Sequence, residues 1–406
     1  MARKRLLIAA SVIATSAIVI AGGAAHATTK GSAITIGASL PLTGPLQAFG
    51  TSLQTGYKAA IAEVNAKGGV VFGGSTHKVN LVVQDNTSDG TKAGTQARSL
   101  VLDSGAVALL GPATPPLTIP VSQVAEQLRV PLISTITPLK GWLSGTQSGY
   151  KYSWDTFFDE TKMTDLQFKA ANLVKTNKKV VVFTDTEQDG PIQAGLWAQH
   201  AAADGYTIVD HIEFPVGNSN FSSQVAKAKA DGADILLAQI IPPDGVALLK
   251  ELKAQNYQPK LTFMEKAGNT GGYVGITDGL AQGVLEANWY AKGIGLPQEA
   301  AFISKYTKAS GGINSNLGTT VAGYSIAKVL LESIVKAGGT DAAKLNTAIG
   351  KTNATYPIGK IKFAADHTSA LPMAITQWNG VNQDMVLTPA GKKAKAIVTP
   401  TAGLKP

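Results

Sequence analysis

The stretch Ile34-Thr35-Ile36-Gly37-Ala38 and the helical pattern after it, over residues 49–64, determine the fold class of this chain. The first segment is short and rich in β-branched residues, which favours a strand. Apolar side chains then recur every three or four residues, the spacing of one helical face, at Phe49, Leu53, Tyr57, Ile61 and Val64. Gly68 and Gly69 follow, and glycine adopts the left-handed backbone that ends helices. The stretch therefore reads as a strand followed by a helix.

Strand-like and helix-like segments continue to alternate in two series. In the first, strands are expected at 79–83, 107–110 and 130–133, and helices at 91–103 and 117–128. In the second, strands are expected at 179–183, 206–213, 235–237 and 261–264, and helices at 191–204, 220–230 and 244–255. Such alternation produces parallel sheets covered by helices. Two series of domain size predict an α/β protein with two doubly wound parallel sheets.

The region after residue 285 is poorer in strands. Helices are expected at 297–309, 318–337 and 341–350, and strand-like pieces near 358–363 and 372–387. These are too few strands for a third α/β domain. We expect the region to pack back onto the first two as extra helices and late strands.

The amino terminus has the pattern of a secretory signal peptide. A cationic start at residues 3–5 precedes an apolar run over 6–24, and Ala25-His26-Ala27 offers the small residues of a cleavage site. We expect residues 1–27 to be removed. The alternative is a retained membrane anchor, because the apolar run approaches the ~20 residues that span a bilayer. Small residues in its second half favour cleavage.

Charge and cysteine content limit the classes of function. The net charge is +9, but seven positive charges lie at the chain ends, on Arg3, Lys4, Arg5, Lys392, Lys393, Lys395 and Lys405. The body is nearly balanced, so no nucleic-acid partner is expected, since such binding needs a clustered basic face. Residues 388–406 form a basic tail that we expect to be solvated and mobile. The chain has no cysteine, which excludes a lipid anchor on that residue and predicts a soluble periplasmic or extracellular protein.

The sequence contains no recognisable catalytic motif. Gly-x-Ser-x-Gly, His-Glu-x-x-His and a phosphate loop ending in Gly-Lys-Ser/Thr are all absent. The histidines are scattered, at His26, His77, His200, His211 and His367. Glycines near 68–74 precede a strand instead of following one, unlike a dinucleotide loop. We therefore expect no enzyme, no cofactor and no metal site.

The loops after the expected strands carry polar groups. These loops are 41–44, 111–115 and 134–137 in the first series, and 184–190, 239–243 and 265–266 in the second. In open parallel sheets, ligands bind at the carboxyl ends of the strands. Hydroxyls, carboxylates and the large aromatic Phe49 are suited to a small polar pocket with an apolar wall.

A series of sequence blocks runs in order through nearly all of the mature chain. The opening blocks are Ile36-Gly37-Ala38-Ser39-Leu40-Pro41-Leu42-Thr43-Gly44-Pro45, Phe49-Gly50, Gly56 and residues 65–70 (NAKGGV). Later blocks are 81–86 (LVVQDN), 110–111 (LG), 130–134 (VPLIS), 182–185 (VFTD), 189–190 (DG), 220–222 (NFS) and 233–235 (ADI). Together they resemble the leucine/isoleucine/valine-binding protein family, the type I solute-binding proteins of ABC importers.

The resemblance implies a type I periplasmic binding protein fold, with two doubly wound parallel-sheet lobes joined by a three-crossover hinge. The first lobe would hold residues 33–155 and 287–362, and the second 156–286 and 363–387. It also implies an extracytoplasmic protein that closes by hinge motion around a small polar metabolite, an amino acid or related compound. ABC permease subunits at the membrane would be its partners, and a monomer is expected.

The resemblance also assigns ligand contacts in the first lobe. The aromatic stacking position falls on Phe49. A serine that helps hold the ligand α-carboxylate in the family falls on Pro115, beside Thr114. A threonine with a similar role falls on Pro138, beside Thr137.

In the second lobe, a position usually held by tyrosine falls on Asp189. The carboxylate that meets the ligand ammonium falls on Ala267, two residues after Glu265. With the strand-end loops, the candidate ligand-binding residues are Phe49, Thr114, Pro115, Thr135, Thr137, Asp189, Ile241 and Glu265. Each has a structural alternative: Phe49 as a core anchor, Asp189 as a helix start, and the threonines as caps.

The second-lobe loops are acidic, which bears on the ligand. They carry Asp185, Glu187, Asp189 and Glu265, with Lys266 as their one basic residue. Pro115 and Pro138 offer neither a side-chain donor nor a backbone N–H. This predicts a ligand with a cationic or hydrogen-bond-donating group instead of a simple carboxylate. The alternative is that the acids are solvated helix starts, and that Phe49 and backbone groups hold a neutral or aromatic ligand.

A second class of function is a ligand-sensing module of the same fold that regulates a separate receptor. The sequence carries no signalling segment of its own, so this function requires a partner. Adjacent permease and ATPase genes would favour transport, and an adjacent kinase gene would favour sensing.

The mature chain is expected to begin at Thr28 and to carry no lipid, because Ala25-His26-Ala27 is the cleavage site and cysteine is absent. Amino-terminal sequencing and intact mass of exported protein check this. Membrane-bound material that starts at Met1 would contradict it.

Overall fold

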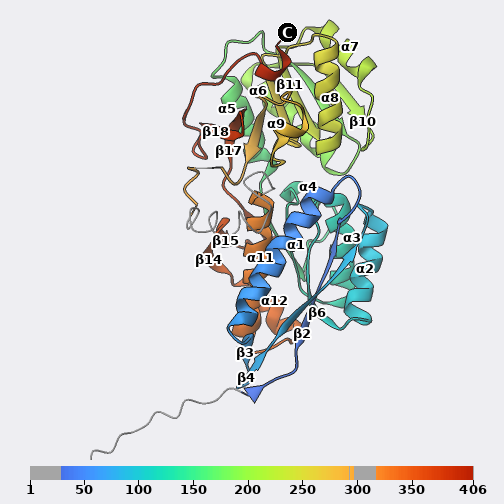
Figure 1. The fold of residues 1–406 in the computed structure, drawn as a ribbon, viewed down its shortest axis with the longest axis vertical. Helices are drawn as coiled ribbons and strands as arrows, with labels where there is room; N and C mark the ends of the chain where they lie inside the picture. Colours follow the sequence, from blue (N-terminus) through green and yellow to red (C-terminus); the bar gives the residue numbers. More distant parts are fainter. Residues whose placement is uncertain (1–28, 292, 297–316, 406) are drawn as a thin grey trace, which may run out of the picture.

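The computed structural model describes residues 29–291, 293–296 and 317–405, and its chain forms two lobes, one above the other in Figure 1. The lower lobe contains a six-stranded sheet and the upper lobe a seven-stranded sheet. Within the described ranges, no helix combines the length and the apolar character needed to cross a bilayer.

The first lobe is built on six parallel strands in the order β16-β8-β7-β6-β2-β5. Their bounds are β2 (Ile34–Leu40), β5 (Val79–Asp85), β6 (Ala106–Leu110), β7 (Leu132–Thr135), β8 (Ser153–Phe157) and β16 (Thr368–Ala370). Its helices are α1 (Gln47–Ala66), α2 (Gly90–Leu102), α3 (Pro115–Leu128), α4 (Leu139–Leu143), α11 (Leu317–Ala337) and α12 (Ala342–Gly350). α1 packs against α11, and α2 against α3.

The two faces of this sheet bury different side chains because residues alternate along each strand. Ile36, Leu110 and Ile133 belong to the core under α1 and α11. Leu109 and Leu132 belong to a separate core under α2 and α3. Two small additions complete the lobe: a sheet of β1 (Thr29–Lys30), β3 (Val70–Phe72) and β4 (Ser75–His77), and a hairpin of β14 (Asn353–Tyr356) and β15 (Gly359–Lys362).

The second lobe has the strand order β10-β9-β11-β12-β13-β17-β18. Its strands are β9 (Lys179–Asp185), β10 (Thr207–Phe214), β11 (Ile235–Ile240), β12 (Leu261–Lys266), β13 (Leu285–Asn288), β17 (Ala374–Asn379) and β18 (Asn382–Leu387). The first five strands pair with one another in parallel. β17 pairs antiparallel with both β13 and β18. Its helices are α5 (Glu160–Ala171), α6 (Asp189–Asp204), α7 (Ser222–Asp231), α8 (Pro242–Ala254), α9 (Tyr273–Ile276) and the short 3₁₀ helix η1 (Ala402–Leu404).

Both lobes place their first five strands in the same order, with the second strand of the series at one edge and the first beside it. The order therefore reverses between β2 and β6 in one lobe and between β9 and β11 in the other. In open parallel sheets such a reversal creates a crevice at the carboxyl ends of the strands, where ligands bind.

The chain passes between the lobes three times: after β8, between β13 and α11, and between β16 and β17. The second passage includes residues outside the described part. The predicted α/β fold with two doubly wound sheets is confirmed. Sequence patterns did not predict β8, α5 or β13, and the helix expected at 297–309 lies outside the described residues.

One late strand joins the lobe opposite to the expected one. β16 lies within 363–387, which the sequence analysis assigned to the second lobe, yet Thr368, Ser369 and Ala370 pair with Asp155, Thr156 and Phe157 of β8. Without β16, β8 would be a free sheet edge, and unpaired edges are commonly covered in this way.

The basic tail was expected to be solvated and mobile; Lys392, Lys393 and Lys395 are exposed, but the end of the tail packs on the second lobe. Leu404 is fully buried in the second-lobe core and η1 packs against α8. The Gln377 side chain forms hydrogen bonds with both the N–H and the C=O of Val398, at 2.9 Å each. Charge composition misled here, because the tail also carries apolar side chains that find cover on the lobe.

Leu404→Ala should lower the free energy of unfolding by about 2–4 kcal/mol, since a fully buried leucine leaves a cavity. Val398→Ala is the matched control, because Val398 is 53% exposed and its bonds are made by the backbone; it should change stability by less than ~0.5 kcal/mol. Urea denaturation measures both. Equal, small effects would mean that the tail does not pack in solution.

Candidate functional site

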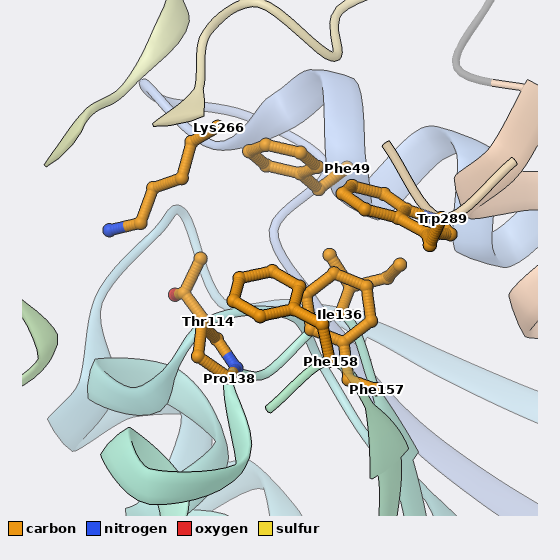
Figure 2. Close-up of a pocket in the computed structure, with 8 residues that line it drawn as sticks. All are labelled: Phe49, Thr114, Ile136, Pro138, Phe157, Phe158, Lys266 and Trp289. Carbon is orange, nitrogen blue, oxygen red and sulfur yellow. The ribbon is translucent and has the colours of Figure 1, made fainter. Parts of the chain in front are cut away.

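A cavity lies between the lobes at the carboxyl ends of their strands (Figure 2). We call it the aromatic chamber, because four rings line it. Its described lining residues are Phe49, Thr114, Ile136, Pro138, Phe157, Phe158, Lys266 and Trp289. Lys266 ends β12 of the second lobe, and Trp289 directly follows β13. The other six come from the first lobe and the first passage.

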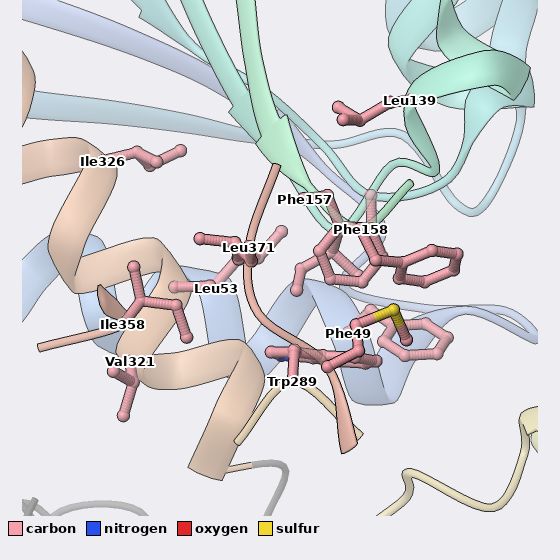
Figure 3. Close-up of a cluster of buried hydrophobic side chains, with 14 of the residues drawn as sticks. Phe49, Leu53, Leu139, Phe157, Phe158, Trp289, Val321, Ile326, Ile358 and Leu371 are labelled. Carbon is pink, nitrogen blue, oxygen red and sulfur yellow. The ribbon is translucent and has the colours of Figure 1, made fainter. Parts of the chain in front are cut away.

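The rings of the aromatic chamber pack against one another. Phe157 lies edge-on to Trp289, with 4.6 Å between ring centroids, and Phe158 lies 4.5 Å from Phe157. Figure 3 shows these rings and Phe49 at the end of the large apolar core that also contains Leu53. The chamber wall is thus continuous with the first-lobe core, which holds the rings in place.

A second cavity adjoins the first, and we call it the polar chamber. The first lobe contributes Pro45, Leu46, Ser88, Thr114, Pro116 and Leu117, and the second contributes Asp185, Glu187, Val216, Ile241 and Lys266. Thr114 and Lys266 line both chambers. The cleft therefore has an apolar part and a polar part, with one residue from each lobe at their junction.

Lys266 is a buried cation between two carboxylates. Its side chain is 9% exposed, and its Nζ lies 2.7 Å from Asp189 Oδ2 and 3.4 Å from Asp185 Oδ2. Burial acts to lower the pKa of Lys266, but the nearby carboxylates of Asp185 and Asp189 outweigh it and raise this pKa above its usual value. In Figure 2 the ammonium points away from the rings. The backbone φ of Lys266 is +63°, a conformation that non-glycine residues adopt rarely and often at functional sites.

Burial changes the titration of the acids beside Lys266. It raises the pKa of Asp185 to about 6, against the lowering effect of Lys266. It also raises the pKa of the half-buried Glu187. The pKa of Glu265 is raised well above its ordinary value, again by burial. Burial thus favours the protonated form of Glu265, whereas Asp185, with a pKa of about 6, is mostly ionised at pH 7.

Thr114 has a strained backbone and an unused hydroxyl. Its φ is +64°, and its N–H donates to the Ile136 carbonyl at 2.8 Å. The side chain is only 4% exposed, yet Oγ1 has no hydrogen-bond partner among the described residues. An unpartnered buried hydroxyl costs free energy, so this group is free to bond a ligand.

The helices that begin at the cleft present few amide donors. α3 starts with Pro115-Pro116, and α8 starts with Pro242-Pro243. Proline has no N–H, so the first two positions of both helices cannot donate. The positive end of each helix dipole remains, but its usual anion-binding amides are reduced.

The sequence-predicted residues fall in different places. Phe49 lines the aromatic chamber, Ile241 the polar chamber, and Thr114 both. Asp189 reaches the cleft through its ion pair with Lys266. Pro115, at the start of α3, and Glu265, in β12, do not line either chamber.

Thr135 and Thr137 are buried behind the aromatic chamber. Thr135 Oγ1 donates to the Thr156 carbonyl at 2.7 Å, and Thr137 Oγ1 lies 2.9 Å from Thr118 Oγ1. Their hydroxyls hold neighbouring backbone and side chains. Sequence reasoning did not select several lining residues: Ile136, Phe157, Phe158, Lys266 and Trp289. Of these, only Ile136 and Lys266 lie in strand-end loops that the sequence indicated, at 134–137 and 265–266.

Glu160 links the lobes beside the first passage. It begins α5 of the second lobe, and its carboxylate accepts the N–H groups of Lys140 (2.9 Å) and Gly141 (2.7 Å) in α4 of the first lobe. The side chain is 1% exposed, and burial raises its pKa to about 7. This contact fixes the start of the hinge.

The fold and the two-chambered cleft define a ligand-binding protein of the two-lobed, hinged class. A sequence model described as periplasmic binding protein matches residues 33–384, so the chain belongs to the periplasmic binding protein family. The predicted family and fold are confirmed, and so is the predicted class of function, solute binding.

Individual relatives agree with this assignment. The chain is 27% identical over 359 residues to Leu/Ile/Val-binding protein homolog 7 of Brucella suis biovar 1, covering 83% of this chain and 85% of the relative. Its fold is similar to the leucine-binding protein LivK from Thermotoga maritima (TM-score 0.76, 22% identity, 87% and 97% covered). It is also similar to a solute-binding protein of an ABC transporter from Rhodopseudomonas palustris BisB5, in complex with 3,4-dihydroxybenzoic acid (TM-score 0.74, 19% identity, 87% and 95% covered).

Glu160→Gln should flatten part of the pH dependence of stability. Because the folded-state pKa of about 7 exceeds the ordinary 4.5, the folded protein keeps a proton that the unfolded chain releases. The free energy of unfolding therefore falls as pH rises from about 4.5 to 7, with a slope from this group of at most about 1.4 kcal/mol per pH unit.

Denaturant unfolding between these pH values measures the slope for the wild type and the variant. Glu213→Gln, on the exposed side of β10, is the control and should keep the wild-type slope. If Glu160→Gln and the wild type show the same slope, the carboxyl is not buried in solution as described.

Proposed function

We propose that this chain is the extracytoplasmic solute-binding component of an ABC importer, and that its lobes close on one small molecule held across the two chambers. The main support for this proposal is that the two chambers adjoin and that both lobes line them. Thr114 and Lys266 line both chambers. A ligand held between the lobes can therefore contact a residue of each lobe at once. Membrane permease subunits are the proposed partners, and export as a soluble monomer is part of the proposal.

The two chambers suit a molecule with two unlike ends. An apolar part of the ligand would contact the rings of Phe49, Phe158 and Trp289, where burial away from water contributes most of the affinity. A polar end then reaches Thr114, Lys266 and the acids of the polar chamber. The named ligands of two relatives, leucine and 3,4-dihydroxybenzoic acid, also combine a compact apolar part with polar groups. Binding without catalysis is proposed, because the family consists of binding proteins.

Solute released from freshly purified, denatured protein is to be identified by mass spectrometry and added back to refolded protein. Small-angle scattering should then show a smaller radius of gyration, because the lobes approach to surround the solute. An unchanged radius at saturation would contradict hinge closure.

The same solute tests the aromatic chamber. Phe49→Leu should weaken binding about tenfold, since about 1.4 kcal/mol of ring contact is lost. Phe221→Leu removes an equally buried ring from the second-lobe core, away from both chambers, and is the matched control. If both variants bind like the wild type, the ligand does not occupy the aromatic chamber.

A further inference from the structure

Carboxylates outnumber cations at the polar chamber. Asp185 and Glu187 line it, and Asp189 lies behind Lys266. Lys266 is the sole basic residue among the described lining residues of the two chambers. The described first-lobe side of the polar chamber is uncharged. When the three carboxylates of Asp185, Glu187 and Asp189 are ionised, they and Lys266 together carry a net negative charge in the absence of a ligand.

The ammonium of Lys266 is already bound to carboxylates. It lies 2.7 Å from Asp189 and 3.4 Å from Asp185, and charge-assisted bonds of this kind are stronger than neutral ones. A ligand carboxylate would have to share this ammonium while facing Asp185 and Glu187. Negative charges brought close together in the chamber repel one another, and burial strengthens this repulsion.

Backbone donors do not compensate for this. The proline pairs that begin α3 and α8 remove the first amides of the helices nearest the cleft. Thr114 Oγ1 is the unpartnered buried hydroxyl that lines both chambers. A hydroxyl accepts as well as donates, so it suits an ammonium as readily as a carboxylate.

We infer that the ligand is an organic cation: an ammonium group attached to an apolar body, with no carboxylate. The inference rests on the proposed function. The ammonium lies in the polar chamber, where Thr114, Asp185 and Glu187 accept its hydrogen bonds. The apolar body faces the rings of the aromatic chamber, which also attract a nearby cation through their negative faces.

Three probes with one phenyl body and different charges test this inference: 2-phenylethylamine, L-phenylalanine and 3-phenylpropionate. Calorimetric titration of the mature, refolded chain at pH 7.5 should show the amine binding at least tenfold more tightly than either of the others. Tighter or equal binding of phenylalanine or phenylpropionate would overturn the inference. So would a lack of measurable binding by all three.

Charge variants give a second, independent readout. Glu187→Gln should weaken amine binding about tenfold and leave phenylpropionate unchanged or stronger, and half-burial of Glu187 makes this variant safe for folding. Asp103→Asn, an exposed acid at the end of α2 far from the strand carboxyl ends, should change neither. Equal amine binding by the wild type and Glu187→Gln would count against the inference.

The titration of Asp185 determines the expected pH dependence of amine binding. Burial raises the pKa of Asp185 to about 6. The charged and titratable groups that face it are Lys266, Asp189, Glu187 and Glu265, and the described first-lobe lining of the polar chamber is uncharged. Protonation of Asp185 removes a partner of the ligand ammonium, so the affinity for the amine should fall as the pH drops from 7 to 5. Below pH 6 this fall should approach a tenfold loss of affinity per pH unit. A flat profile would contradict the assignment.

Failure of this inference and failure of the proposed function look different. If phenylpropionate binds best and Phe49→Leu weakens it, the site stands and the charge assignment is wrong. If the solute released from the protein neither compacts it nor responds to Phe49→Leu, the proposed function itself is wrong, and the inference falls with it.

Discussion

Parallel pairing of strands is the constraint on which this structure depends. A parallel sheet needs a crossover helix between successive strands, so every strand in the series ends at the same edge. In this protein both lobes follow that rule with the same strand order, and both strand-end edges face one cleft. Loops that are distant in sequence, such as those holding Thr114 and Lys266, therefore meet without any direct connection between them.

The buried ion group of Lys266, Asp185 and Asp189 gives this cleft its electrical character. Burying charges is unfavourable unless they are paired. One ammonium paired with two carboxylates leaves one negative charge without a counter-charge. At Glu265, burial raises the pKa of the carboxyl well above its ordinary value, which favours the uncharged form. The positive φ angles of Lys266 and Thr114 place strained backbone on both sides of the same junction. Strain and uncompensated charge in one place are typical of a binding site.

The aromatic rings connect the ligand chamber to the hinge. Phe157 ends β8, Phe158 follows it in the first passage, and Trp289 lies just after β13 at the second passage. Their mutual contacts join two of the three interlobe passages and also form the chamber wall. Glu160 adds a polar link beside the first passage. In the proposed mode of binding, a ligand that contacts these rings also contacts two of the segments that join the lobes.

Much of the fold was determined by the sequence alone. The spacing of Phe49, Leu53 and Tyr57 predicted α1, and continuous apolar runs predicted the buried strands, because each pattern depends only on local periodicity. The blocks around residues 36–45 also predicted the family. Tertiary structure decided the rest. The fifth strands, β8 and β13, carry polar residues such as Asp155 and Glu286 that only their folded surroundings make compatible with burial.

The site shows the same division. Phe49 and Thr114 were predictable because they follow strand ends, but the partner of Lys266 was not. Glu265 was predicted in the pocket because it lies in an expected strand-end loop, two residues before Ala267, where the family resemblance puts the carboxylate that meets the ligand ammonium. In the folded chain β12 extends through both residues, and only Lys266 lines the chambers, whereas Glu265 is buried near the same ion group. Which neighbour lines the cleft depends on the backbone at the strand end, where Lys266 has a φ of +63°, and the pairing of Glu265 with Gln239 and of Lys266 with Ile240 exists only once the sheet has formed.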